Sequence, residues 1–243
     1  MRKTDFEKQN KKNIDLMSKD KELSKISRNW FVKGYKYEYS YHFKWLDRPI
    51  IQYPQDILAL QEIIWKVKPD LIIETGIAHG GSLIFSASML ELLGKGTVLG
   101  IDIEIRQHNK TEIKKHTLSK RIKMIEGSSI DEKIVKKIKA FSKRAKNILV
   151  ILDSNHTHEH VLRELEIFSS FVTKGSYLIV FDTIIDDMPP KLLKNRPWKK
   201  NNNPKSAVKE FLKTNKRFKV DAEIEKKLLI TAAPNGYLKC IKK

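Results

Sequence analysis

The sequence is poor in cysteine and glycine, lacks long apolar runs and carries far fewer acidic than basic residues. Its one cysteine, Cys240, excludes an internal disulfide framework and suits a reducing compartment. No apolar run approaches the roughly 18 residues that a membrane-spanning helix needs. Residues 1–28 are strongly polar and have none of the apolar core of a secretory signal. We therefore expect a cytoplasmic protein, with association with the inner membrane surface left open.

The excess of basic residues raises the question of an anionic partner. Lysine and arginine number 48 and acidic residues 29, which gives a formal net charge of +19 at pH 7. Clustered lysines bind nucleic acids by neutralising phosphates. Here the lysines are spread along the chain, and no strand combines aromatic and basic residues as RNA-binding sheets do. We expect no nucleic acid partner, whereas an anionic substrate or membrane surface stays open.

The central part of the sequence alternates between short apolar runs and segments with helical spacing. Runs rich in Ile, Leu and Val predict five strands, at 71–75, 97–102, 122–127, 147–153 and 176–182. The predicted helices are 54–68, 82–94, 109–120, 131–145 and 158–172. Nearly continuous apolar strands between helices are typical of a parallel sheet that is covered on both faces. The sequence therefore predicts an α/β, Rossmann-like fold, with residues 54–243 as a single domain.

Three segments depart from this alternation. Residues 1–53 predict a polar, loosely helical extension followed by an aromatic-rich cap segment. Residues 184–204 contain four prolines and little periodicity, which predicts a lid loop. After a helix at 206–215, the chain predicts a C-terminal antiparallel hairpin with Pro234-Asn235-Gly236 as its turn.

Acidic or small polar residues follow every predicted strand. Ligands of open parallel sheets bind at the carboxyl ends of the strands, so these side chains mark a candidate site. The residues concerned are Glu74, Asp102, Ser128, Ser129, Asp153 and Asp182.

The loop after the first strand has the pattern E-x-G-x-A-x-G, from Glu74 to Gly80. A dinucleotide-binding loop has the pattern G-x-G-x-x-G and places a pyrophosphate near the helix N-terminus, where a carboxylate is unfavourable. Glu74 instead suits a ligand with a cationic amino acid portion, such as S-adenosylmethionine. Asp102 would then accept hydrogen bonds from the ribose hydroxyls, and residues 127–129 would border the adenine.

Asp153 and Asp182 end two consecutive predicted strands, so their carboxylates are candidate ligands for a hard ion such as Mg²⁺. They could equally cap nearby helices. His156 follows Asp153 and has the intrinsic pKa of a general base, although a role as a polar cap is as consistent with its position. The sequence has no His-x-Asp or His-x-Glu pair, which counts against a non-heme iron oxygenase.

Taken together, several segments resemble the cephalosporin hydroxylase / rhamnosyl O-methyltransferase family over about residues 40–240. The segments are 48–57, 68–90, 100–106, 126–129, 152–166, 175–183 and 202–212. The resemblance implies an S-adenosylmethionine-dependent O-methyltransferase of the class I fold, which uses Mg²⁺ and methylates a sugar hydroxyl. It further implies a sugar or glycan acceptor, free or lipid-linked, in the synthesis of surface polysaccharide, lipopolysaccharide or a glycoside. The oligomeric state, including a homo-oligomer, stays open.

The resemblance also implies roles for individual residues. The cofactor-binding set is Gln52, Tyr53, Glu74, Thr75, Gly76, Ala78, Gly80, Ser82, Asp102, Ser128, Ser129 and Asp153. Asp153 and Asp182 would hold the metal, and Asp153 or His156 would be catalytic as the base. Asp56 is a further candidate beside the cofactor.

One position departs from the family pattern. An acidic residue usually precedes the second metal ligand, and this chain has Phe181 there. Asn155, Thr183 or water would then complete the metal shell. A non-catalytic protein that binds S-adenosylmethionine therefore remains an alternative, and the basic charge leaves an RNA methyltransferase as another.

Overall fold

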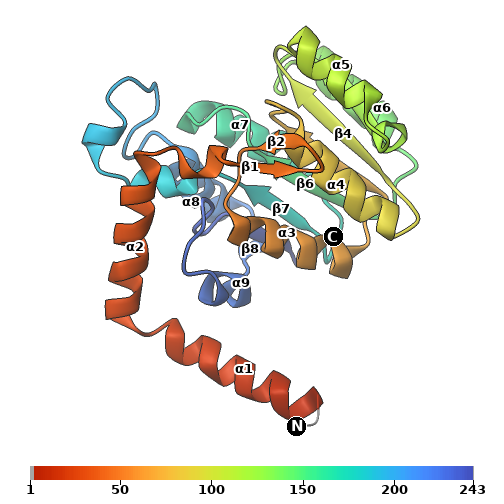
Figure 1. Cartoon of the computed structure of the whole chain (residues 1–243). Coiled ribbons are helices and arrows are strands. Elements are labelled where there is room, and N and C mark those ends of the chain that lie inside the picture. Colours follow the sequence, from red (N-terminus) through yellow and green to blue (C-terminus); the bar gives the residue numbers. More distant parts are fainter. Residues whose placement is uncertain (1–2, 243) are drawn as a thin grey trace.

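A seven-stranded sheet forms the centre of the molecule in the computed structural model, which describes residues 3–242 (Figure 1). The strand order is β5-β4-β3-β6-β7-β9-β8, and β9 is antiparallel to both of its neighbours whereas the other pairings are parallel. The strands are β3 Leu71–Thr75, β4 Thr97–Asp102, β5 Ile122–Glu126, β6 Ile148–Leu152, β7 Tyr177–Val180, β8 Phe218–Val220 and β9 Tyr237–Cys240. The α/β fold and all five strands expected from the apolar runs are thus confirmed.

Helices cover both faces of the sheet because its central strands are apolar on both sides. Every residue of β3, β6 and β7 is buried. Side chains of β3 alternate between two apolar clusters, with Ile72 in one and Ile73 in the other. The first cluster includes residues of α3 Pro54–Val67, α4 Gly81–Leu92 and α5 Gln107–Lys115. The second includes residues of α6 Glu132–Ser142, α7 His158–Phe168 and α8 Pro204–Thr214.

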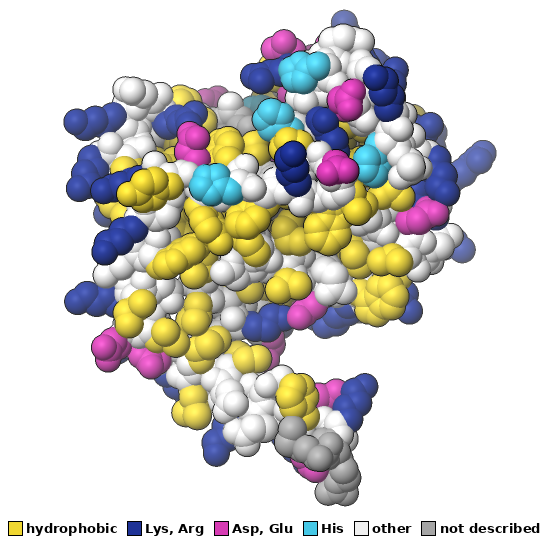
Figure 2. All heavy atoms as spheres, viewed as in Figure 1, with side chains coloured by type: hydrophobic (Ala, Val, Ile, Leu, Met, Phe, Trp, Pro, Cys, Tyr) yellow, Lys and Arg dark blue, Asp and Glu magenta, His cyan; other side chains and the backbone are white. Residues whose placement is uncertain are grey.

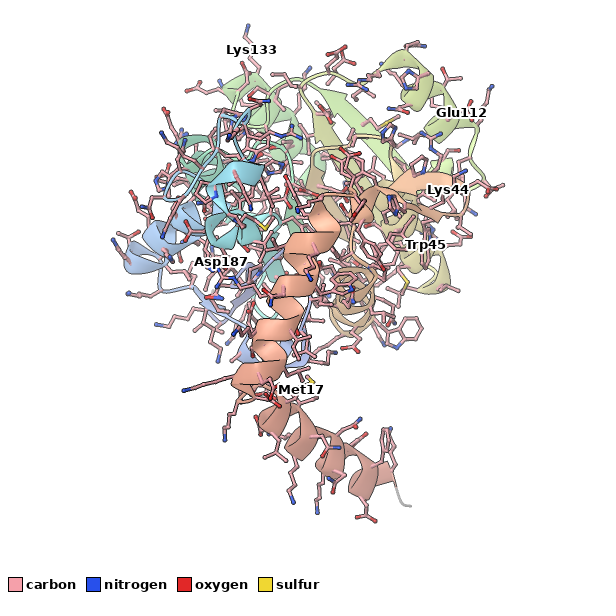
Figure 3. The ribbon with its side chains drawn as sticks, turned by 60° about the vertical axis from the view of Figure 1, so that its left-hand side comes forward. Met17, Lys44, Trp45, Glu112, Lys133 and Asp187 are labelled. Carbon is pink, nitrogen blue, oxygen red and sulfur yellow. The ribbon has the colours of Figure 1, made fainter. Side chains whose placement is uncertain are left out.

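The N-terminal extension forms two well-defined helices, where the sequence predicted only loose helical structure. They are α1 Lys3–Met17 and α2 Lys21–Tyr35. Helix α1 buries none of its residues and projects from the sheet domain as an arm that turns into α2 near Met17 (Figure 3). Helix α2 lies against the domain, since Phe31 is buried and Arg28 donates a hydrogen bond to the carbonyl of Asp187. Among the described residues, no helix is both long and apolar enough to cross a membrane.

The aromatic cap segment packs over α4 and the loop before it. After the 3₁₀ turn η1 Tyr39–Tyr41, strands β1 Phe43–Trp45 and β2 Arg48–Ile50 form a separate antiparallel pair. Trp45 packs edge-on against Phe85 and donates a hydrogen bond to Ser88 on α4. The segment expected to pack over the domain therefore forms one wall of the cavity described below.

The C-terminal antiparallel pairing is present, but its turn was predicted wrongly. Strand β9 pairs with β8, and these strands are separated by α9 Ala222–Lys227 and a long irregular stretch. Pro234-Asn235-Gly236 leads directly into β9. The chain before this turn is not a strand because Thr231 and Ala232 donate hydrogen bonds to the fully buried carboxylate of Asp56. A contact with α3 thus replaces the expected pairing.

The predicted lid, residues 184–204, is irregular but packed. It includes the short 3₁₀ turns η3 Thr183–Asp187 and η4 Pro190–Leu192. A 3₁₀ turn outside the lid, η2 Ser119–Arg121, precedes β5. The lid's own side chains Ile185, Met188 and Leu193 are buried against the domain. Whether it opens and closes as a lid stays a prediction.

Gly76 occupies the point where the loops that follow β3 and β6 cross most closely. Its φ is +89°, and a Cβ atom at this position would overlap the backbone carbonyl of Asp153. The N–H of Asp153 donates to the carbonyl of Thr75 at 2.9 Å, and the N–H of Gly76 donates to Ile101 at 2.8 Å. Glycine is therefore required here both for the left-handed backbone and for the space.

We expect Gly76→Ala to destabilise the fold by well over the about 1–2 kcal/mol that a left-handed backbone alone costs an alanine. Gly175→Ala is the matched control, because Gly175 has a φ of +88° but a Cβ there would meet open space. Urea unfolding followed by circular dichroism measures both. Equal losses of stability would show that the crowding against Asp153 carries no energetic weight.

Candidate active site

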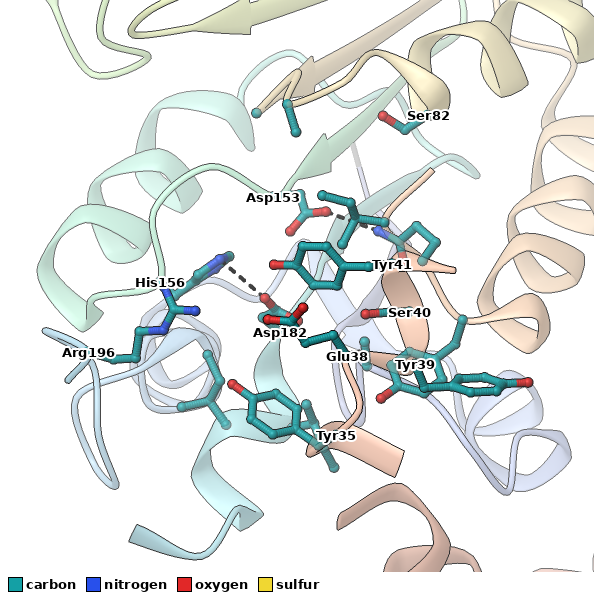
Figure 4. Close-up of a pocket in the computed structure, with 18 of the residues that line it drawn as sticks. Tyr35, Glu38, Tyr39, Ser40, Tyr41, Ser82, Asp153, His156, Asp182 and Arg196 are labelled. Atoms are coloured by element: carbon teal, nitrogen blue, oxygen red, sulfur yellow. Dashed lines mark hydrogen bonds and ion pairs between the residues drawn. The ribbon is translucent and has the colours of Figure 1, made fainter. Parts of the chain in front are cut away.

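A cavity of about 490 Å³ lies at the carboxyl ends of β3, β6 and β7 (Figure 4). Three parts of the chain that are far apart in sequence enclose it. They are the glycine loop with Gly76 and the first turn of α4 with Ser82, the strand ends with Asp153 and Asp182, and the cap segment. The predicted lid closes a further side. The site expected from the strand ends is therefore a real concavity, as open parallel sheets favour.

Glu74 has a buried carboxylate, and one of its two oxygens forms no hydrogen bond with any described residue. It is 1 % exposed, the Ser82 hydroxyl donates to its Oε1, and its Oε2 has no hydrogen-bond partner. Burial raises the pKa of Glu74 to about 7, although the bond from Ser82 opposes the rise. The Glu74 carboxylate is not part of the cavity wall, but Ser82 is. A buried acid with one unpaired oxygen, one side chain away from a cavity, fits a cationic ligand group.

Other parts of the glycine loop are held by backbone and side-chain contacts. Gly80 has a φ of +84° and precedes α4, and Ala78 has a φ of +45°. Ala78 lines the cavity, whereas Thr75 is buried and its hydroxyl has no partner. Asp102 at the end of β4 accepts a 2.7 Å hydrogen bond from the N–H of Ile77. Asp102 therefore anchors this loop, and its predicted contact with a ribose stays a prediction.

The two serines predicted to border an adenine lie outside the cavity wall. Ser129 is buried and donates to the buried carboxylate of Glu164 at 2.6 Å, with His160 at 3.2 Å from its Oγ. Ser128 follows β5 in the same loop. Because the Ser129 hydroxyl already donates to Glu164, the structure gives it a role in joining the loop after β5 to α7.

Gln52 and Tyr53 reach the cavity from the cap segment. Gln52 is buried, donates to Asp153 Oδ2 at 3.0 Å and leaves its own Oε1 without a partner. Tyr53 stacks on Phe31 of α2 with ring centroids 4.6 Å apart. Asp56, the other candidate, does not line the cavity. It is fully buried, and Tyr237 donates to its Oδ1 at 2.7 Å, so it ties α3 to the C-terminal segment.

Asp153, His156 and Asp182 form the polar cluster of the cavity. One ligand atom from each residue lies within 4.8 Å of the others, and His156 Nε2 is 3.2 Å from Asp182 Oδ2. Asp153 and Asp182 were expected to approach because β6 and β7 are neighbours, and they do. Burial, with the negative charge of Asp182 as the next cause, holds the pKa of Asp153 well above its usual range. Two carboxylates and an imidazole at this spacing fit a divalent cation.

The residues proposed to complete the metal shell are engaged elsewhere. Asn155 Oδ1 accepts hydrogen bonds from Thr157, and the Thr183 hydroxyl donates to the carbonyl of Pro234. Phe181 packs in the core beside Tyr237 and does not line the cavity. The third group beside the two acids is therefore His156.

The neighbouring histidines are held outside the cavity wall. His158 Nδ1 is 2.8 Å from the Ser206 hydroxyl and its Nε2 is 3.2 Å from Glu210. His160 Nε2 is 3.6 Å from Glu164. Neither histidine can join His156 at a common ion, in agreement with the argument against an iron oxygenase.

The cavity-lining residues that sequence reasoning missed include Tyr35, Tyr41, Arg196 and Trp198. The Trp198 ring packs edge-on against His156 with centroids 4.7 Å apart, and the Arg196 guanidinium lies 5.4 Å from the centroid of the same ring. The aromatic density of the cap segment and the Arg-Pro-Trp triplet were the available signals. Neither has a periodicity that would indicate which side chains face inward.

Comparisons with known proteins place the chain in a family. The family model described as Rhamnosyl O-methyltransferase/CmcI matches residues 37–241. A rhamnosyl O-methyltransferase of Mycobacterium tuberculosis is 32% identical over 190 residues, which cover 75% of this chain and 72% of that protein. A rhamnosyl O-methyltransferase of Mycobacterium leprae is 28% identical over 203 residues, with coverage of 80% and 81%.

Solved structures of CmcI share the fold at low sequence identity. One, with Mg and S-adenosylmethionine, has a TM-score of 0.57 at 17% identity and covers 83% of this chain and 78% of its own. The apo structure has a TM-score of 0.58 at 17% identity, with coverage of 84% and 78%. The sequence match spans the sheet, the glycine loop and the acidic strand ends. This chain therefore belongs to the Rhamnosyl O-methyltransferase/CmcI family.

Proposed function

We propose that this chain transfers the methyl group of S-adenosylmethionine to a hydroxyl group of a sugar. The observation that carries the proposal is the meeting, in one cavity, of the glycine loop backed by Glu74 with the cluster of Asp153, His156 and Asp182. The relatives named rhamnosyl O-methyltransferases support a sugar as the acceptor. A structure of CmcI that contains Mg and S-adenosylmethionine supports the cofactor.

The methyl donor would bind along the glycine loop. Its cationic amino acid portion would lie over Ser82, with the unpaired Oε2 of Glu74 behind it as the counter-charge. The close approach of Gly76 to the backbone of Asp153 leaves no side chain between the loop and the acidic cluster. Gln52 would keep the Asp153 carboxylate oriented through its 3.0 Å hydrogen bond.

Asp153 and Asp182 would hold Mg²⁺, which when bound would act as a Lewis acid on the acceptor hydroxyl. We assign the removal of the hydroxyl proton to His156, because it lies in the cluster and Asp182 Oδ2, 3.2 Å from its Nε2, would orient the imidazole. The acceptor oxygen would then attack the methyl carbon in line, so that the O–C bond forms as the S–C bond of the donor breaks and S-adenosylhomocysteine leaves. Since the donor is already activated, the contribution of the protein is mainly to position the two substrates and exclude water.

Isothermal titration with S-adenosylmethionine, followed by methyl transfer to rhamnosides, tests the proposal. We expect one binding site per chain and release of S-adenosylhomocysteine only when a sugar acceptor is present. Turnover with RNA in place of a sugar would contradict the proposal, and so would donor binding without transfer to any glycan of a broad panel.

Donor affinity should depend on pH through Glu74. Below the pKa of about 7 the carboxyl is protonated in the free protein, so binding of a cation must remove that proton. We therefore expect the Kd to rise by up to about tenfold for each pH unit below 7. Glu74→Gln should bind the donor about tenfold or more weakly at pH 7.5 and lose this slope between pH 5.5 and 7.

Glu225→Gln is the matched control for this titration. Burial also raises the pKa of Glu225 to about 7, but its carboxylate accepts from Asn235 and does not line the cavity. Glu225→Gln should show the same dependence of the donor Kd on pH as the unmodified protein. If this pH dependence also persisted in Glu74→Gln, the proton would belong to another group and Glu74 would not be the counter-charge.

Metal binding should depend on the two strand-end carboxylates. We expect Mg²⁺ to raise the melting temperature of the protein, and Asp153→Asn or Asp182→Asn to abolish that rise. Asp131→Asn should retain it, because Asp131 caps α6 and asparagine caps a helix N-terminus about as well. Scanning fluorimetry with increasing Mg²⁺ measures the effect without reference to activity.

His156→Asn distinguishes the base from a metal ligand. As the base, His156 contributes to methyl transfer, so its loss should lower kcat by about 100-fold or more while the effect of Mg²⁺ on melting persists. If His156→Asn lost both methyl transfer and the effect of Mg²⁺ on the melting temperature, His156 would instead be a third ligand of the ion.

A further inference from the structure

The segment 188–209, which follows η3, is strongly basic. It contains seven lysines and arginines and no acidic residue between Asp187 and Glu210. Lys205 and Lys209 form ion pairs with Asp187 and Asp186. The other five basic residues form no ion pair with any described residue; they are Lys191, Lys194, Arg196, Lys199 and Lys200. We call residues 188–209 the basic segment.

The basic segment reaches the cavity through Arg196 and Trp198, which both line it. Figure 4 shows Arg196 beside His156 and Asp182, on the side where Tyr35 points inward. The guanidinium is held over the Trp198 ring, and the same ring contacts His156. The Arg196 guanidinium thus lies next to the catalytic cluster and forms no ion pair with a carboxylate of any described residue. In Figure 2, dark blue side chains lie along the upper left edge, where Figure 1 places the loop that follows β7, and others lie at the upper right.

Tyr35 and Tyr41 of the N-terminal part of the chain line the cavity together with Arg196. Burial raises the pKa of both tyrosines, and the Arg196 guanidinium opposes that rise. Lys36 and Glu38, one charge of each sign, also line the cavity. The carboxylates of Asp153 and Asp182 would be neutralised by the ion that they hold. The positive charge of Arg196 and the exposed lysines then remains uncompensated.

We propose, building on the methyltransferase function above, that the acceptor sugar is attached to a phosphate or diphosphate that Arg196 binds while the sugar hydroxyl lies at the catalytic cluster. A planar guanidinium donates two parallel hydrogen bonds to a phosphate, and stacking on Trp198 fixes its orientation in advance. The four lysines add charge along the path by which the phosphorylated end would leave the cavity. Tyr35 and Tyr41 would face the sugar.

A neutral glycoside would leave this charge without a partner, which is why we favour a phosphorylated acceptor. Two sources present the same chemistry: a sugar carried by a nucleoside diphosphate and a sugar carried by a prenyl diphosphate lipid. The cavity binds the shared phosphate group in either case, and the moiety beyond it would lie outside, over the basic segment.

The experiment compares one sugar in four forms by isothermal titration and methyl transfer: methyl rhamnoside, rhamnose 1-phosphate, thymidine diphosphate rhamnose and a short-chain prenyl diphosphate rhamnose. Inorganic pyrophosphate without divalent ions is a fifth probe, which reports on the anion site without the sugar or the metal, and its comparison with Arg196→Gln isolates the contribution of Arg196. We expect the phosphorylated forms to have at least tenfold lower Kd and KM than methyl rhamnoside, with an affinity that falls steeply as salt increases.

Arg196→Gln should remove the preference for phosphorylated forms, and Arg196→Lys should restore part of it. Lys137→Gln, on the exposed face of α6, removes the same charge from another element and should change nothing. A lower Kd for the nucleotide or for the prenyl form identifies the carrier, and both results support the proposal. The proposal would be overturned if the unmodified protein and all variants bound methyl rhamnoside as tightly as they bind the phosphorylated forms.

The two proposals fail separately. Methylation of methyl rhamnoside that equals that of the phosphorylated forms, unchanged in Arg196→Gln, would leave the methyltransferase function standing and remove the phosphate site. Absence of donor binding would remove the methyltransferase function, while the pyrophosphate titration would still report whether Arg196 binds the anion. Pyrophosphate binding that Arg196→Gln does not weaken counts against the site in every case.

Discussion

The close approach of Gly76 to the backbone of Asp153 is the constraint on which the rest of the site depends. It brings the loop after β3 into contact with the loop after β6, and the N–H of Asp153 reinforces this contact by donating to Thr75. The loop after β3 connects the buried Glu74 to Ser82 at the start of α4. The loop after β6 carries Asp153 and His156 of the polar cluster. With any side chain at residue 76 the two loops would separate, and the donor side of the cavity would move away from the acidic side.

Charge is distributed over the cavity in a way that matches the proposed reaction. The buried carboxylate of Glu74 lies on the donor side and the partly exposed carboxylates of Asp153 and Asp182 lie on the metal side, where cations would bind. Arg196 lies on the side of the cap and the basic segment, where an anion would bind. Among the described residues, Glu74, Asp153 and Arg196 have no ion-pair partner of opposite charge, and Asp182 has only His156, which is charged only when protonated. A buried charge without compensation costs stability, and the natural explanation is that ligands supply the missing charges.

Much of the fold and part of the site could be predicted from local patterns. The five apolar strands and the helices between them follow from residue periodicity, and the neighbouring positions of Asp153 and Asp182 follow from the order of the strands. The errors arose where a distant contact replaced a local preference. The carboxylate of Asp56 holds Thr231 and Ala232, so the expected hairpin turn does not join two strands. Thr183 and Asn155 satisfy nearby backbone and side-chain groups and leave His156 as the third member of the cluster.

The sequence by itself determined the parallel sheet, the glycine loop and the acids at the strand ends, because these depend on periodicity and on residues close together in the chain. Only the tertiary structure decided which aromatic and basic side chains face the cavity, since the cap and basic segments have no regular spacing and take their positions from packing. Tyr35, Arg196 and Trp198 come from opposite ends of the chain and meet only because α2 and the segment after η3 lie over the same edge of the sheet.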